Sequence, residues 1–234
     1  MRIVQFVALI FPLLGWGQNN TVFQLWNEAG IGYKIDKKQQ IGLDLTTRFD
    51  NLGLSTYFPQ LSYKYKINKN IRPSIDYRFI GDRTISGSFI EKHRLNLNLQ
   101  LSKDINRFEF DLRLRYQYSS NRLVANIEPE FGRAIRIRPS VAYNVKNIKL
   151  TPQFSSEFFT GPMDYQKGYH LNRIRWKLGM SYAFDGPSQI EVAYFYDQRI
   201  SDPGALNRAI LNLSYNYQIK NKSKSSKNRN PRSL

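Results

Sequence analysis

The chain has 234 residues and a formal net charge of +17, and it contains no cysteine. The missing thiols exclude disulfide bonds, thiolate zinc sites and a cysteine nucleophile. The mean hydropathy of −0.52 is in the range of water-soluble proteins, but a transmembrane β-barrel gives similar values because half of each strand faces a polar lumen.

Residues 1–17 are predicted to be a signal peptide. Arg2 gives the start of the chain a positive charge, residues 3–14 are mostly apolar, and Gly15 and Gly17 supply the small side chains expected before a cleavage site. The alternative is a retained membrane helix, but such a helix needs about 20 apolar residues. This run is shorter and contains Pro12, so the sequence predicts export.

From residue 23 onward, apolar and polar residues alternate in eleven segments. This two-residue period is that of a β-strand with one apolar and one polar face. Many segments have about 10 residues, the length that a tilted strand needs to cross a bilayer. In chain order, the predicted strands are 23–35, 40–49, 57–67, 71–79, 93–101, 108–118, 135–145, 148–159, 171–184, 189–199 and 209–219.

The connections between these segments alternate in length. Short turns alternate with the longer connections 50–56, 81–89, 119–133, 160–168 and 200–205. This plan predicts an all-β fold over residues 18–220, an antiparallel up-and-down transmembrane β-barrel of about 10–12 strands with short periplasmic turns and longer outer loops. The predicted location is the cell outer membrane, and the basic segment 221–234 is predicted to be a disordered tail.

The count of eleven segments raises a question, because bacterial single-chain barrels have an even number of strands. Either one strand is missed or merged with a neighbour, or the first strand is placed unusually. A soluble, lipocalin-like barrel is the alternative fold, and it would turn the apolar face of each strand inward.

Aromatic residues gather at the ends of the predicted strands. Strand propensity alone explains their presence but not this position. Aromatic side chains at two heights are typical of the girdles that contact lipid headgroups, so outer-membrane lipids are predicted partners. The end of the last strand, Tyr217-Gln218-Ile219, is interpreted as a signal for the barrel-assembly machinery. The predicted girdle comprises Tyr33, Tyr65, Tyr143, Tyr182, Tyr217, Phe49 and Phe79.

Several short motifs resemble those of a known family. They are Trp26, Tyr33-Lys34-Ile35, Thr47-Arg48-Phe49, Tyr63-Lys64-Tyr65, Asp76-Tyr77-Arg78-Phe79, Glu91-Lys92-His93-Arg94 and Arg113-Leu114-Arg115-Tyr116. On these motifs the chain resembles the uncharacterised outer-membrane β-barrel proteins of Bacteroidota known as domain of unknown function 2490. The resemblance implies an exported barrel and no known activity.

Many charged residues fall on the polar face of the predicted strands. One interpretation is a lumen filled by arginine–carboxylate pairs. The alternative is an anion-selective pore for small solutes, lined by the surplus arginines. Nucleic acid is not a predicted partner, because the basic residues alternate with membrane-facing ones and form no exposed stripe. The predicted lumen charge network comprises Arg48, Asp76, Arg78, Arg94, Asp111, Arg113, Arg115, Arg173, Arg175 and Glu191.

The two histidines, His93 and His170, lie near predicted strand starts on the outer side. A lipid hydrolase active at the rim is therefore a second alternative, since such an enzyme needs a serine–histidine pair. No nucleophile motif accompanies them, and the two are not at metal-ligand spacing. The sequence predicts a protein that is not an enzyme, with no catalytic residue, metal or cofactor.

Overall fold

The computed structural model describes residues 21–120, 133–162, 169–200 and 206–220, and every regular element among them is a β-strand. No helix long and apolar enough to cross a membrane occurs in these ranges. The strands are β1 (Thr21–Lys34), β2 (Gln39–Asp50), β3 (Gly53–Tyr65), β4 (Ile71–Arg83), β5 (Phe89–Ile105), β6 (Phe108–Ser120), β7 (Arg133–Tyr143), β8 (Leu150–Pro162), β9 (Tyr169–Ala183), β10 (Ser188–Arg199) and β11 (Asn207–Lys220).

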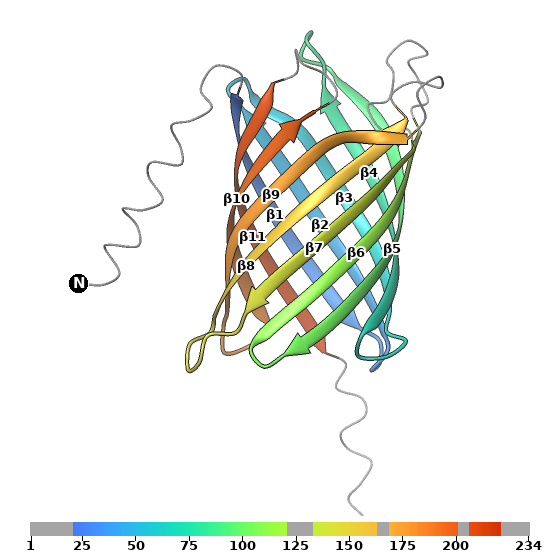
Figure 1. Cartoon of the computed structure of the whole chain (residues 1–234). Helices are drawn as coiled ribbons and strands as arrows, with labels where there is room; N and C mark the ends of the chain where they lie inside the picture. Colours follow the sequence, from blue (N-terminus) through green and yellow to red (C-terminus); the bar gives the residue numbers. More distant parts are fainter. Residues whose placement is uncertain (1–20, 121–132, 163–168, 201–205, 221–234) are drawn as a thin grey trace, which may run out of the picture.

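The strands form one closed barrel in which each strand pairs with the next along the chain (Figure 1). The prediction of an all-β, up-and-down barrel is confirmed. All consecutive pairs are antiparallel. The pair that closes the barrel, β1 with β11, is parallel, which is a difference from the fully antiparallel plan.

The parallel seam follows from the odd number of strands. In an up-and-down barrel the first and eleventh strands run in the same direction, so they can close the wall only as a parallel pair. Their register is unbroken from Thr21 opposite Asn207 to Lys34 opposite Lys220. Of the two explanations for an odd count, the structure therefore shows the unusual placement of the first strand, which begins at the end of the barrel where the long connections lie (Figure 1).

The two faces of the wall differ sharply in polarity. Leu43, Leu61 and Leu178 point outward and are 57%, 53% and 54% exposed. Asn96 and Asp197 point into the barrel and are buried. The apolar face is thus turned outward, the opposite of a lipocalin-like barrel.

One predicted long connection, 50–56, is wrong. β2 and β3 continue to Asp50 and Gly53, which leaves a two-residue turn. The Asp50 carboxylate accepts a hydrogen bond from the Leu52 amide at 2.8 Å, and Gly53 has a φ of +97°, which glycine adopts without strain. Residues 1–17 and 221–234, predicted as signal peptide and tail, lie outside the described residues.

The parallel seam predicts a specific pattern of disulfide cross-links, and the chain offers no competing native cysteine. Leu25 lies opposite Leu211, and Tyr33 lies opposite Ile219. Paired positions on adjacent strands lie within disulfide reach, so the two double-cysteine variants made from these pairs are expected to cross-link under mild oxidation. The disulfide joins the first strand to the last strand and is detected as a mobility shift on a non-reducing gel.

The matched control recombines two of the same substitutions. Leu25→Cys with Ile219→Cys places the thiols eight residues apart along the seam, about 26 Å at ~3.3 Å per residue. This variant is expected to stay uncross-linked. A cross-link in the control, and none in the two matched pairs, would contradict the parallel register.

Candidate functional site

The lumen contains two cavities. One of about 710 Å³, here called the arginine chamber, is lined by residues of all eleven strands and reaches the long-connection end, where Asp50 and Arg83 line it. The other, of about 1100 Å³ and here called the turn-side cavity, is lined by residues of the first short turn together with Lys64 and Arg72. The two cavities share no lining residue.

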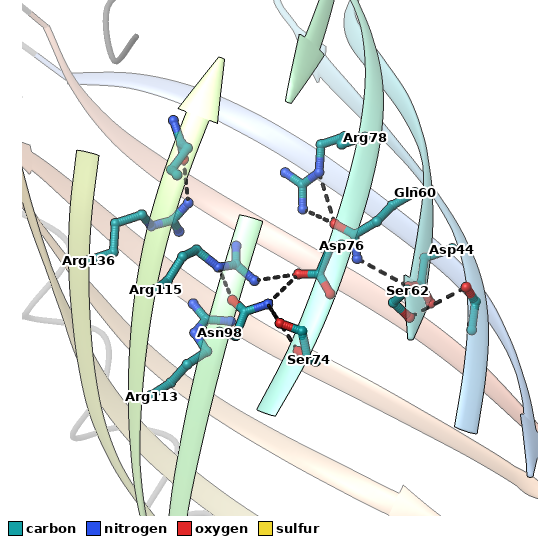
Figure 2. A network of polar contacts seen from close by, with 12 residues as sticks. Asp44, Gln60, Ser62, Ser74, Asp76, Arg78, Asn98, Arg113, Arg115 and Arg136 are labelled. Carbon is teal, nitrogen blue, oxygen red and sulfur yellow. Dashed lines mark hydrogen bonds and ion pairs between the residues drawn. The ribbon is translucent and has the colours of Figure 1, made fainter. Parts of the chain in front are cut away.

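A hydrogen-bonded layer, here called the floor, lies between the cavities on β4, β5 and β6 (Figure 2). Asp76 accepts hydrogen bonds from Asn98 Nδ2 at 2.9 Å and from Arg115 Nη2 at 3.0 Å. Asn98 also accepts from Arg115 Nε at 2.5 Å and donates to Ser74 Oγ at 3.0 Å. Because Ser74 lines the turn-side cavity and Arg115 lines the chamber, these contacts lead from one cavity to the other.

Side chains also close over the inward face of β1. A Cβ atom at Gly30 would overlap the oxygens of Asp44 and Asn216, so glycine is needed for these groups to approach the strand. One layer further toward the turns, Gln40 donates a hydrogen bond to Gln218 at 3.0 Å. Polar side chains of β2 and β11 thus cover the inward face of β1 at these two levels.

Two buried carboxylates each bridge two arginines in the chamber wall. Glu157 binds Arg113 at 2.6 Å and Arg136 at 2.8 Å. Asp197 binds Arg173 at 3.2 Å and Arg175 at 2.9 Å. Each cluster of two arginines and one carboxylate keeps one net positive charge.

Aromatic rings on the inward face of the barrel pack against further guanidinium groups. The Arg48 guanidinium lies over Trp26, with its carbon 3.9 Å from the ring centroid, and over Phe58 at 4.8 Å. Arg78 lies over the same Phe58 ring at 4.1 Å, and Arg175 approaches Trp26 at 5.0 Å. Cation–π contacts of this kind hold a guanidinium in place and leave the donors at its edge available.

The same arrangement continues on β8. Arg136 lies 4.3 Å and Arg175 lies 5.1 Å from the centroid of Phe159. Aromatic rings and arginines thus follow one another around the lumen, and Arg175 is shared between Phe159 and Trp26. This arginine–aromatic belt comprises Arg136, Phe159, Arg175, Trp26, Arg48, Phe58 and Arg78.

Positive charge dominates the chamber lining. Thirteen lining residues are cationic, and six are acidic, namely Glu28, Asp44, Asp50, Asp82, Glu157 and Glu191. In the described ranges, no carboxylate forms an ion pair with Arg48, Arg78 or Arg138. The cationic lining residues are Arg48, Arg78, Arg83, Lys92, Arg94, Arg113, Arg115, Arg136, Arg138, Arg173, Arg175, Lys177 and Arg208.

The predicted charge-network residues all lie on strands of the barrel, where they take part in several groups of contacts. Arg115 pairs with Asp76, whereas Glu191 pairs with Lys177 at 2.6 Å. Arg94 donates to Ser119 at 3.0 Å. Asp111 lines neither cavity and accepts hydrogen bonds from Gln100, at 3.0 Å, and from Ser102.

The sequence analysis missed the inward aromatic rings and the central role of the two bridging carboxylates. Phe58 follows the same alternation as Gln60 and Ser62, so its inward orientation was a detectable signal. Glu157 and Asp197 also fall on the polar face, but only the strand register shows that each one meets two arginines.

The predicted girdle residues lie at strand ends. Tyr33, Tyr65 and Tyr217 are exposed near the short turns. Tyr143 and Tyr182 also lie near short turns, whereas Phe49 and Phe79 lie near the other end of the barrel. Their contact with lipid stays a prediction.

His93 lies on the outer face of β5, and its contacts are aromatic. Its Nδ1 is 2.7 Å from the Tyr77 hydroxyl, and its ring packs against Phe79. Among the described residues, no cluster of three or more histidine, aspartate or glutamate side chains is arranged to hold a metal ion. Its contacts with Tyr77 and Phe79 place His93 in an aromatic cluster on the outer face of the barrel.

The fold and the site define a closed β-barrel with a cationic, divided lumen. The chain matches the family described as "Protein of unknown function (DUF2490)" over residues 23–209, from β1 into β11. It belongs to this family, as its strand motifs predicted. No curated protein matches the chain.

Replacing Glu157 by glutamine tests the bridging role. The change keeps the shape of the side chain but leaves Arg113 and Arg136 buried without their shared negative charge. We expect Glu157→Gln to lower the free energy of unfolding by about 3–5 kcal/mol, measured by urea unfolding of the barrel in detergent micelles. Glu91→Gln is the control, because Glu91 is exposed and its loss should change stability by about 0.5 kcal/mol or less. Equal effects of the two changes would contradict the bridging role.

Proposed function

We propose that the protein is an integral outer-membrane β-barrel whose arginine chamber binds anionic solutes. The observation that carries the membrane placement is the exposed apolar outer face. Large apolar side chains cover it on successive strands, including Leu43, Leu61, Leu97, Leu178 and Leu213. Soluble monomers rarely expose apolar patches beyond a few hundred Å², whereas lipid covers such a face in a transmembrane barrel.

The proposed orientation places the long connections outside and the short turns in the periplasm. The chamber then faces the exterior, and the turn-side cavity faces the periplasm. The outward tyrosines near the short turns are proposed to contact lipid headgroups. We also propose that the barrel-assembly machinery recognises the end of β11.

Anion binding is supported by the imbalance of charge in the chamber. Within the described ranges, Arg48, Arg78 and Arg138 have no carboxylate partner, and Glu157 and Asp197 each neutralise only one of two arginines. Partly buried cations are costly without compensating negative charge. A bound anion supplies that charge, so the chamber favours anionic ligands.

An anion-selective pore is the second candidate, because the turn-side cavity is also basic, with Lys34, Lys64 and Arg72 in its lining. The floor argues for a closed barrel, since a pore needs a continuous aqueous path. A lipid hydrolase would need a serine beside His93, and in the described part of the chain the hydrogen-bond partner of the His93 Nδ1 atom is the Tyr77 hydroxyl. The proposal therefore includes binding and no catalysis.

The membrane placement predicts that the cost of a charge depends on its height on the outer face. Leu213 lies in the middle of β11, and Ile67 lies beyond the end of β3; both are exposed. We expect Leu213→Arg to cost about 2–4 kcal/mol and Ile67→Arg about 0–1 kcal/mol of unfolding free energy in lipid vesicles. The wild-type protein should partition with outer membranes and migrate on gels in a heat-modifiable way. Small, equal costs at both heights, with a water-soluble wild type, would reject the membrane placement.

The closed floor predicts the behaviour of the protein in planar bilayers. Purified wild-type protein is expected to insert without step-like conductance, because the floor interrupts the lumen. Electrical recordings in potassium chloride check this result. Conductance steps that select anions, and that lose selectivity in Arg48→Gln and Arg78→Gln variants, would establish the pore instead.

A further inference from the structure

We infer that the ligand of the arginine chamber is a compact phosphate polyanion. This inference rests on the proposed function, which assigns only anions in general to the chamber. Three properties of the chamber lead to the phosphate class: its charge density, the directions from which the belt arginines approach, and the way in which those arginines are held.

The charge density of the chamber is high. Thirteen cationic residues line a volume of about 710 Å³. Among the residues that the structure describes, six carboxylates line the chamber and two more, Asp76 and Asp197, pair with its arginines, which leaves five positive charges in excess. A phosphate group carries about −1.5 to −2 at neutral pH, whereas a carboxylate of similar size carries −1. A short phosphate chain therefore brings the most negative charge into this volume.

The belt arginines approach the lumen from separate sides of the wall. Arg48 comes from β2, Arg78 from β4, Arg136 from β7 and Arg175 from β9. A carboxylate has only two acceptor oxygens, and they lie in one plane. A phosphate has oxygens in tetrahedral directions and accepts from several forks at once. Linked phosphates thus fit donors that surround the ligand.

The aromatic rings hold the guanidinium groups before any ligand arrives. Arg48 lies over both Trp26 and Phe58, and its Nε has no hydrogen-bond partner. Stacking holds a guanidinium in place before a ligand binds, which lowers the loss of side-chain freedom on binding. Arg78 is held further by Gln60 Oε1, which accepts hydrogen bonds from its Nε and Nη2 atoms. Arg48 and Arg78 are also the belt members to which the described part of the chain supplies no ion-paired carboxylate, so they are the residues from which we expect the strongest effect on the ligand.

Binding of sodium triphosphate to the full-length protein in detergent micelles tests the inference by isothermal titration calorimetry at constant ionic strength. We expect triphosphate to bind more tightly than pyrophosphate, inorganic phosphate or citrate, and chloride to compete weakly. Arg48→Gln and Arg78→Gln should each weaken triphosphate binding by about 10- to 100-fold, the effect of losing hydrogen bonds to a charged group. Arg48→Lys keeps the charge but loses the stacked fork, and it should give an intermediate affinity.

Lys64→Gln is the matched control, because Lys64 lines the turn-side cavity and not the chamber. The affinity of the Lys64→Gln variant for triphosphate should stay within about twofold of that of the wild type. Heat-modifiable migration of each variant shows that the barrel is intact. Citrate bound as tightly as triphosphate would overturn the phosphate class. An equal or larger loss in Lys64→Gln would overturn the assignment to the chamber.

The failures of this inference and of the proposed function are distinguishable. A wild type that partitions with outer membranes and binds citrate or chloride, but not triphosphate, overturns the phosphate class alone. A wild type that binds none of these anions also removes anion binding from the proposed function. A wild type that is water-soluble removes the membrane placement, whatever it binds.

Discussion

The pairing of β1 with β11 is the contact on which the rest of the barrel depends. A β-sheet leaves a row of unpaired amides and carbonyls at each edge, and only closure removes both edges. Here closure joins the two ends of the described chain, and the odd number of strands requires them to run in the same direction. Every other feature, from the outward leucines to the belt in the lumen, needs a wall whose curvature this seam completes.

Closure also decides what the interior must contain. Inward side chains of eleven strands meet in the lumen, where many of their polar groups are buried and need partners. The structure meets this need in two ways. Near the floor, Asp76, Asn98 and Arg115 satisfy one another; in the chamber, arginines share Glu157 and Asp197 or lie against aromatic rings. The first arrangement is complete within the protein, whereas the second leaves an excess of positive charge, and this difference separates a structural layer from a candidate binding site.

The two-residue period was sufficient to predict the fold class, eleven alternating segments and the face of most residues, but it left open whether the strand number is odd. It assigned Arg48 and Arg78 to the lumen and Leu213 to the outer face, because successive side chains of a strand alternate between its two faces whatever the neighbouring strands are. It did not give the contacts between strands. Arg113 and Glu157 are 44 residues apart in the sequence, and their ion pair depends on the registers of β6, β7 and β8. The prediction of a long connection over 50–56 was wrong for a related reason. Pairing between β2 and β3 extends both strands, to Asp50 and from Gly53, and leaves only a two-residue turn.

The parallel seam has a consequence for how the chain can be rearranged. In a barrel with an even number of strands, the chain enters and leaves at the same rim, and a short loop suffices to join its ends. Here β1 starts at one rim and β11 ends at the other, a separation of about 46 Å along a strand of 14 residues. A circular permutant would need a connector that runs the full height of the wall. A gene rearrangement that moves whole hairpins would leave one of the eleven strands without a hairpin partner. The order of strands in this barrel is therefore fixed by its closure more firmly than in even-stranded barrels.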